Sequence, residues 1–167
     1  MENLSIKSIE NNKPEILISS CLIGCPVRYN GSSSEVEGLG KLVKEGKAIA
    51  MCPEIVGGLP TPREPVEIEQ GKTAKEVLEG NAKVLDKEGK DYTQEFVNGA
   101  NELLKVCKEK GIKTVILKEG SPSCGSSKTY DGTFSGNKIS GRGITAELLN
   151  QNGISVYCEH NFPKELL

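Results

Sequence analysis

The sequence has no tryptophan, one histidine, and no apolar run of the roughly 20 residues that a membrane-spanning helix needs. Its first residues also lack the basic and apolar regions of a signal peptide. We therefore expect no membrane partner and predict a cytoplasmic protein. The single histidine, His160, lies near the end of the sequence and pairs with no obvious serine, so a Ser–His hydrolase is not expected.

Runs of lysine and arginine are missing as well. The 167 residues include 21 basic and 23 acidic side chains, which gives a formal net charge of -2. Proteins that hold nucleic acid without regard to its sequence neutralise many phosphates, so no nucleic-acid partner is expected and a small substrate fits better. The composition leaves the oligomeric state open between monomer and homodimer.

Short apolar runs alternate with longer amphipathic segments, a pattern typical of α/β proteins with a mostly parallel sheet. The predicted strands are 16–19, 48–51, 115–118 and 154–157, with a weaker edge or hairpin strand at 82–85. The predicted helices are 93–110, capped by Thr93 and ended by Gly111, then 145–152 and 34–45. We expect a single-domain, three-layer α/β fold, Rossmann-like, with helices on both faces of the sheet. Residues 1–14 are predicted to be an N-terminal extension and 15–167 one domain.

Two long stretches, 57–71 and 119–143, are rich in proline, glycine or serine and are predicted to be irregular. Loops this long in a small domain usually carry function. The second stretch ends in a glycine-rich lead into the helix near Thr145, where free N–H groups can bind an anion.

Six cysteines are unusual in a chain that is expected to stay in a reducing compartment. Cys21 and Cys52 directly follow predicted strands, and Cys124 lies in a turn just beyond a third. Because the carboxyl ends of parallel strands form one edge of the sheet, we expect these three thiols to converge. Three converging soft ligands indicate a metal centre with one open position. Thiolate softness admits zinc or an iron–sulfur cluster, and small residues beside the cysteines favour the cluster.

The other three cysteines have simpler interpretations. Cys107 lies on the apolar face of its predicted helix and is expected in the core. Cys158 ends a predicted strand and is a candidate fourth ligand, and Cys25 is a candidate sulfur-relay thiol.

Several motifs resemble those of the thiouracil desulfidase family. They are CLIG and VRYNG at 21–24 and 27–31, CPEIVGGLPTPR at 52–63, LKEGSPSCG at 117–125 and YDGTFSG at 130–136. The resemblance covers about residues 15–160. It implies a 4Fe-4S cluster bound by Cys21, Cys52 and Cys124, whose fourth iron takes the sulfur of a thiolated pyrimidine. Asn30 stands where the family commonly has aspartate. Some relatives carry an additional C-terminal domain that handles RNA, and this sequence ends at Leu167 before any such domain, so a base, nucleoside or nucleotide substrate is expected rather than tRNA.

The expected reaction is hydrolytic and non-redox, converting a thiocarbonyl and water into a carbonyl and sulfide. Glu54 and Glu119 are candidates for activating water, with Asp131 as a third, and Ser121 is expected to face the open iron. The residues expected to bind substrate are Arg28, Asn30, Lys118, Ser123 and Asp131. Glu54 can instead pair with Arg63, and Lys118 and Glu119 can instead form a salt bridge at a strand end.

Two alternative functions remain open. A persulfide-based sulfurtransferase would use one cysteine to attack sulfur and another to resolve it, and Cys25 beside Cys21 suits that chemistry. A zinc-stabilised binding module would need the thiols but would catalyse nothing.

Overall fold

Four parallel strands form the central sheet, in the order β2-β1-β5-β8. They are β1 (Ile16–Ser19), β2 (Ala48–Met51), β5 (Thr114–Leu117) and β8 (Ser155–Cys158). The computed structural model describes residues 13–167, so most of the predicted N-terminal extension, 1–14, lies outside the described residues. The four predicted strands are confirmed to within one residue at each end.

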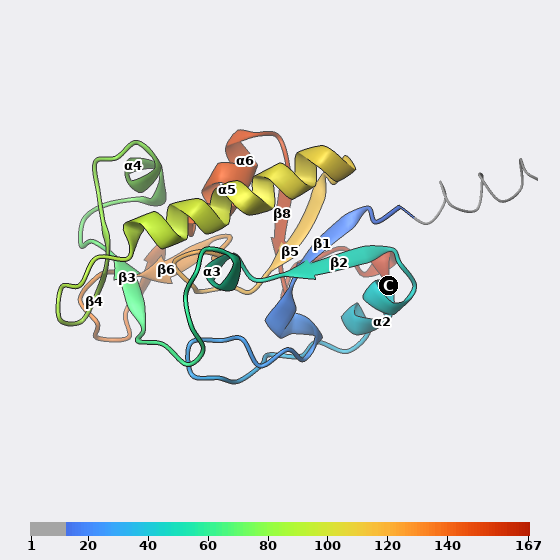
Figure 1. Ribbon diagram of the computed structural model, residues 1–167, viewed down its shortest axis with the longest axis horizontal. Helices are drawn as coiled ribbons and strands as arrows, with labels where there is room; N and C mark the ends of the chain where they lie inside the picture. The colour runs from blue at the N-terminus through green and yellow to red at the C-terminus, as the bar shows by residue number, and fades with distance from the viewer. Residues whose placement is uncertain (1–12) are drawn as a thin grey trace, which may run out of the picture.

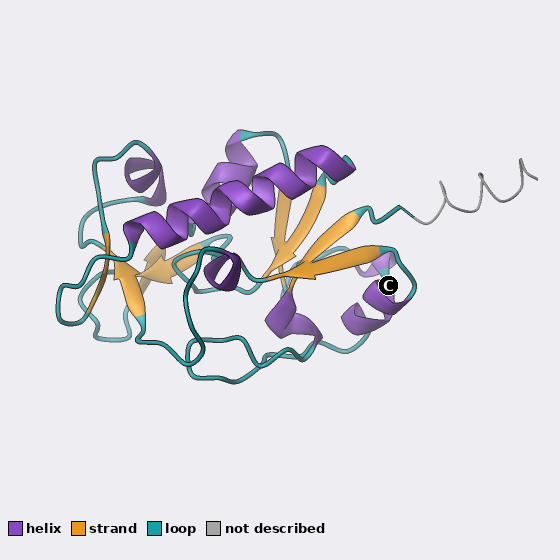
Figure 2. Cartoon of the chain, in the orientation of Figure 1, coloured by secondary structure: helices purple, strands orange, loops and turns teal. Residues whose placement is uncertain are grey.

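Helices cover both faces of this sheet (Figures 1 and 2). The long α5 (Thr93–Lys110) and α6 (Ile144–Gln151) pack on one face, where Leu103 and Leu149 meet Leu17 of β1. On the other face, α2 (Leu39–Lys44) and the short η2 (Lys164–Leu166) cover Ile16, Ile18 and Ile116. The predicted three-layer α/β fold is therefore confirmed, and the continuous apolar runs of β1 and β5 follow from burial of both faces.

The ends of two helices differ from prediction. Tyr92, not Thr93, is the N-cap of α5, and no side chain caps it. The Thr93 hydroxyl instead accepts the N–H of Val84 at 2.9 Å, so its predicted capping role is wrong, whereas Gly111 ends the helix as predicted. The predicted helix 34–45 begins only at Leu39, because Gly38 has a φ of 91° and breaks the helical path before it.

Two small antiparallel hairpins extend the fold beyond the sheet. The first joins β3 (Val66–Ile68) to β4 (Val84–Asp86), which confirms the predicted hairpin strand near 82–85. The second joins β6 (Lys128–Tyr130) to β7 (Lys138–Ser140). Both stretches that were predicted to be irregular thus contain short strands. The remaining elements are α3 (Pro53–Val56), α4 (Ala74–Leu78) and the single turn η1 (Ser20–Ile23).

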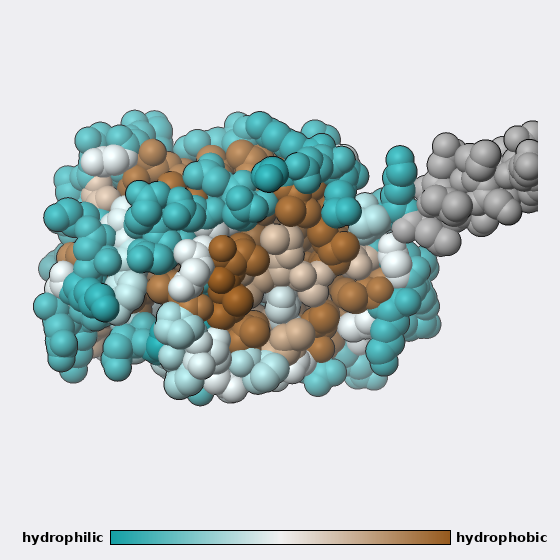
Figure 3. All heavy atoms as spheres, in the orientation of Figure 1, coloured by the Kyte–Doolittle hydropathy of each residue, from teal (hydrophilic) through white to brown (hydrophobic). Residues whose placement is uncertain are grey.

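The sheet has one edge at β2, and the surface beside it is apolar. In the view of Figure 3, hydrophobic atoms gather over β2 and α3, where Val56 is 41% exposed. None of the described helices is long and apolar enough to cross a membrane.

The crossover direction reverses between β1 and β5. The chain leaves β1 through α2 on one face to reach β2, and it leaves β5 through α6 on the other face to reach β8. In open α/β sheets such a switch point opens a crevice at the carboxyl ends of the strands, and ligands bind there. This edge of the sheet is therefore the first place to look for a site.

Candidate active site

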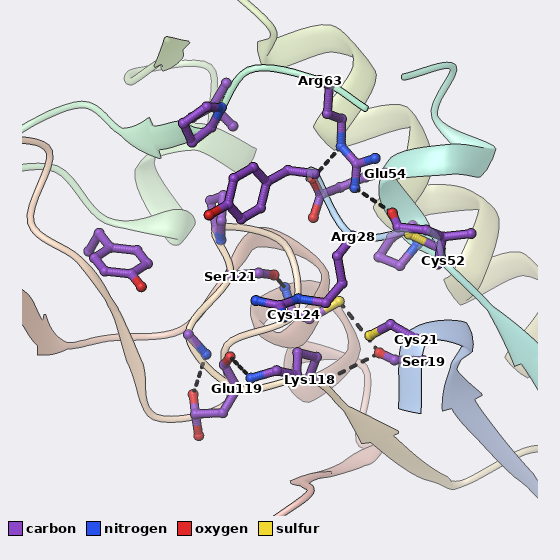
Figure 4. Close-up of a pocket in the computed structure, with 18 of the residues that line it drawn as sticks. Ser19, Cys21, Arg28, Cys52, Glu54, Arg63, Lys118, Glu119, Ser121 and Cys124 are labelled. Atoms are coloured by element: carbon purple, nitrogen blue, oxygen red, sulfur yellow. Dashed lines mark hydrogen bonds and ion pairs between the residues drawn. The ribbon is translucent and has the colours of Figure 1, made fainter. Parts of the chain in front are cut away.

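A cavity of about 310 Å³ lies at the carboxyl ends of β1, β2 and β5, and Cys21, Cys52 and Cys124 all line it. Cys21 lies in η1 directly after β1, Cys52 is the N-cap of α3 directly after β2, and Cys124 lies in the turn after β5. Figure 4 shows the three cysteines pointing toward a common space. The predicted convergence is therefore observed, while their role as ligands stays a prediction.

The three thiols are desolvated, and Cys52 affects the pKa of the other two. Burial, and to a lesser degree the nearby Cys52 thiol, raises the pKa of Cys21 to about 11. Burial also raises the pKa of Cys52, and burial together with Cys52 raises that of Cys124 well above its usual range. Lys118 and Arg28 lower the pKa of Cys21, but burial outweighs them. A cationic metal centre would convert this donor set to thiolates.

The spacing of the donors bears on the kind of metal centre that they could hold. Across residues 13–167, no three histidine, cysteine, aspartate or glutamate side chains gather closely enough to hold a single metal ion. In an iron–sulfur cluster each thiolate binds a different iron, so the ligands surround the cavity rather than one point. Three thiols spread around one cavity are an arrangement that suits a cluster.

A chain of hydrogen bonds runs from the cavity wall into the protein. The backbone N–H groups of Ser123 and Cys124 donate to Ser121 Oγ at 3.2 and 2.7 Å. The hydroxyls of Ser121 and Ser123 lie 3.1 Å apart, and Ser123 Oγ donates to Glu54 Oε2 at 2.8 Å. Because Ser121 Oγ already accepts two N–H groups, its own proton is free for Ser123 or for a ligand.

The other oxygen of Glu54 belongs to a buried ion pair. Arg63 Nε donates to Glu54 Oε1 at 3.1 Å, and the two side chains are only 7% and 13% exposed. The same guanidinium donates to the carbonyl oxygens of Val27 and Pro60 at 3.0 and 3.1 Å. The alternative prediction of a Glu54–Arg63 pair is thus confirmed, and the pair leaves Oε2 directed to Ser123.

Three comparisons place this architecture among known proteins. Residues 16–161 match the family described as 2-thiouracil desulfurase. The chain belongs to that family. An uncharacterized protein of Bacillus subtilis (strain 168), YbbK, is 52% identical over 145 residues, which cover 87% of this chain and 95% of the relative. A solved structure, described as the [4Fe-4S]-dependent thiouracil desulfidase TudS, is 45% identical with a TM-score of 0.80, covering 91% of this chain and 95% of the other.

Membership of the 2-thiouracil desulfurase family confirms the predicted family and enzyme class, because both the family and the solved relative are named for removing sulfur from thiouracil. The likeness to TudS also confirms the expected fold. The cavity with its three cysteines is therefore the candidate active site of this family member.

Glu119 lines the cavity of this desulfurase-family chain, but its carboxylate is hydrogen-bonded to the loop of residues 126–128. Its Oε1 accepts the N–H groups of Ser126, Ser127 and Lys128, and its Oε2 accepts two serine hydroxyls. Desolvation raises the pKa of this carboxyl, but the hydrogen bonds from Ser127, Lys128 and Ser126 outweigh it and lower the pKa to about 2. Glu119 therefore holds the loop that carries Cys124.

The remaining candidate substrate-binding residues divide into two groups. Arg28 and Lys118 line the cavity, although Lys118 also forms a salt bridge with Glu159 at 2.8 Å. Asn30 and Asp131 lie outside the cavity wall and stabilise local turns, accepting the N–H groups of Ser32 and Thr133. Hydrogen bonds from Thr133 lower the pKa of Asp131.

The glycine-rich lead into α6, which the sequence offered as a possible anion site, uses its N–H groups within the protein. The N–H groups of Ile144 and Thr145 donate to the carbonyl oxygens of Pro122 and Ser123 at 2.8 and 2.9 Å. The helix terminus therefore supports the Cys124 turn instead of a ligand. Cys107 lies in the core as predicted, and Cys25 and Cys158 do not line the cavity.

Sequence reasoning missed several residues of the cavity wall. The most informative are Tyr29, Glu67, Tyr130 and Lys138. Glu67 and Tyr130 lie in three-residue strands, and Lys138 in another, and none of these strands has a recognisable hydrophobic period. Tyr29 and Tyr130 belong to the motifs VRYNG and YDGTFSG, which are the signal that could have found them, whereas Glu67 and Lys138 are identified only by their place in the folded chain.

Proposed function

We propose that this protein is a desulfidase that uses a 4Fe-4S cluster, held by Cys21, Cys52 and Cys124, to remove sulfur hydrolytically from a thiolated pyrimidine. One observation carries the proposal: three thiols from separate strands line one cavity, beside a carboxylate that is held in place. The description of TudS as [4Fe-4S]-dependent supports the same cofactor here. When bound, the cluster supplies a Lewis-acidic iron without a protein ligand, which suits the soft sulfur of a thiocarbonyl.

The protein's own groups then serve the attacking water. Glu54 lines the cavity, and its Oε2 accepts the water proton while the water oxygen adds to the thiocarbonyl carbon. The C–S bond breaks, and sulfur leaves as hydrogen sulfide with the two protons of the water. A thiocarbonyl and water become a carbonyl and hydrogen sulfide, so no electrons are gained or lost.

Ser121, Ser123 and Arg63 prepare Glu54 for this step. Arg63 holds Oε1 and Ser123 holds Oε2, so the carboxylate cannot rotate away from the cavity. Ser121 lines the cavity and has a free proton to donate toward the departing sulfur. Arg28 and Lys118 are placed to donate to a carbonyl or phosphate oxygen of the substrate. The turns at Asn30 and Asp131 support the loops that carry the cavity wall.

The test is anaerobic reconstitution with iron and sulfide, followed by measurement of the visible spectrum, the iron content and sulfide release. We expect about four irons per chain and sulfide release from 2-thiouracil or 4-thiouridine. Cys21→Ala, Cys52→Ala and Cys124→Ala should each lose both iron and activity. Cys107→Ala is the matched control, because Cys107 is a buried core thiol outside the cavity.

Two outcomes would overturn the proposal. A colourless protein that still releases sulfide, and loses it when one cysteine is changed, would indicate persulfide chemistry. A colourless, inactive protein that binds one zinc would indicate a binding module.

A further inference from the structure

Glu67 is a buried carboxylate in the wall of the active-site cavity for which the proposed reaction has no use. It lies in the middle of β3 and is 8% exposed. A carboxylate in such a place needs hydrogen-bond donors, since burying an unpartnered charge is costly. Glu67 is one of the residues that line the same cavity as the three cysteines.

The protein satisfies only one of the two oxygens of Glu67. Oε1 accepts the N–H groups of Gly132 and Phe134, at 2.9 and 3.2 Å. No group within residues 13–167 donates to Oε2. In the same part of the chain, the hydroxyl of Thr145 is the one fully buried side-chain atom without a partner. Glu67 Oε2 is therefore not fully buried, and a ligand can reach it. The cavity that Glu67 lines is the space from which a ligand would approach.

The loop that holds Oε1 is itself fixed. Gly132 has a φ of 90°, and a Cβ there would lie 2.6 Å from the backbone nitrogen of Gln70. Phe134 also adopts a left-handed conformation, with a φ of 56°. The loop is therefore seated closely against the end of β3, and its two N–H groups cannot turn to other partners. This geometry fixes which oxygen of Glu67 is available to a ligand.

Two aromatic side chains near Glu67 suit a flat ring. Tyr29 and Tyr130 line the cavity, and Lys138 Nζ lies 5.5 Å from the centre of the Tyr130 ring. Seven other charged side chains share the cavity wall with Glu67: Arg28, Glu54, Arg63, Glu64, Lys118, Glu119 and Lys138. Among residues 13–167 none of these side chains, the cations Arg28 and Lys138 included, donates a hydrogen bond to Glu67, whose bonds reach Oε1 alone. Oε2 is therefore an acceptor without a donor from this part of the chain.

Resting on the proposed function, we infer that Glu67 Oε2 accepts the N3–H of the thiolated pyrimidine and selects for substrates that carry it. In a pyrimidine ring, N3 lies between C2 and C4, so its N–H adjoins the reacting carbon whether sulfur is at position 2 or 4. The base, the nucleoside and the nucleotide all keep this N–H. Glu67 is thus a specificity-determining residue that reads a feature shared by every candidate substrate.

The substitution Glu67→Gln tests this contact with almost no change of shape. The N–H groups of Gly132 and Phe134 require an oxygen, so the amide oxygen of glutamine takes the place of Oε1. The amide NH2 then faces the cavity. The variant therefore replaces an acceptor by a donor at one atom, opposite the donor N3–H.

Wild type and Glu67→Gln are compared with 2-thiouracil and with 3-methyl-2-thiouracil, which lacks N3–H. We expect Glu67→Gln to lower kcat/KM for 2-thiouracil roughly 10- to 100-fold, as for a buried hydrogen bond to a charged group. For the methylated compound, wild type and variant should differ less than about threefold. Glu69→Gln is the matched control, because Glu69 Oε1 also accepts a backbone N–H, from Lys83 at 3.1 Å, but lies outside the cavity wall.

A binding measurement makes the result independent of turnover. Calorimetry with uracil and 3-methyluracil should show that wild type prefers uracil and that Glu67→Gln loses this preference. If wild type releases sulfide but Glu67→Gln affects both thiolated compounds equally, or neither, the role of Glu67 is refuted while the proposed function stands. If wild type releases no sulfide from any thiolated pyrimidine and binds uracil and 3-methyluracil equally, both are refuted.

Discussion

Glu119 offers a perturbation whose size can be worked out from the structure. Replacing it with alanine removes the acceptor of four backbone N–H groups, those of Gly120, Ser126, Ser127 and Lys128, at 2.9 to 3.2 Å. A net hydrogen bond contributes about 1 kcal/mol. The side chain is half-buried, so water can replace part of this. We expect Glu119→Ala to lower the free energy of unfolding by about 3 kcal/mol, or Tm by about 6–12 °C.

Glu119→Gln should do much less harm at neutral pH. The glutamine oxygen can accept the same four N–H groups, and its NH2 can donate to the hydroxyls of Ser126 and Ser127, which rotate to accept. We expect this variant to retain its iron and its sulfide release. Glu119→Ala should lose both in part, because the loosened loop carries Cys124.

The pH dependence supplies a second measurement. Because the pKa of Glu119 is lowered to about 2 in the folded protein, the fold favours the ionised carboxylate. Its stabilisation is fully present above the ordinary pKa of glutamate and is lost as the pH falls toward 2. In Glu119→Gln this contribution is absent, so the free energy of unfolding should decrease less in acid than it does in wild type.

Urea denaturation at pH 7 and at pH 3 measures both effects, with Glu79→Ala as the control for loss of an exposed glutamate. A midpoint for Glu119→Ala equal to that of the control would refute the assignment of Glu119 to the loop. Loss of activity in Glu119→Gln with unchanged stability and iron content would instead make Glu119 a catalytic base.

Three further changes test other contacts. Arg63→Lys keeps a charge but cannot make all the guanidinium bonds to Glu54, Val27 and Pro60, so kcat should fall roughly tenfold or more with iron content retained; unchanged steady-state kinetics would contradict this. Gly132→Ala places a Cβ 2.6 Å from a backbone nitrogen, and thermal unfolding should show Tm lowered by several degrees, whereas an unchanged Tm would mean that the loop yields freely. Cys107→Ala should cost about 1 kcal/mol in urea denaturation and leave the visible spectrum unchanged, and a bleached protein would assign Cys107 to the metal centre.

The central sheet could be predicted because its strands are buried on both faces and therefore appear in the sequence as short apolar runs. Leu17 and Val115 face one helix layer while Ile16, Ile18 and Ile116 face the other, so these strands have no polar side. Parallel pairing then brings their carboxyl ends together, and the cysteines that follow the strands must converge. The candidate metal ligands follow from this rule without any side-chain detail.

The opposite wall of the cavity could not be predicted, since its strands are too short to show a period. β6 and β7 have three residues each, and every residue of β7 is exposed. They are held by pairing and by the loop against Glu67, not by an apolar face. Thr93 misled for a different reason, because its hydroxyl accepts the N–H of Val84 and donates to Asp91 Oδ1 and so does not cap α5.

The pairing of β1 with β5 has a consequence for biosynthesis. Ile16 lies beside Thr114 in the sheet, so the two strands that flank the switch point are synthesised far apart in time. Cys21 and Cys52 leave the ribosome long before Cys124, and contacts of such large sequence separation form late in folding. We expect cluster insertion to follow release of the chain, into a sheet that has already formed, rather than to guide folding as the metal does in a zinc finger.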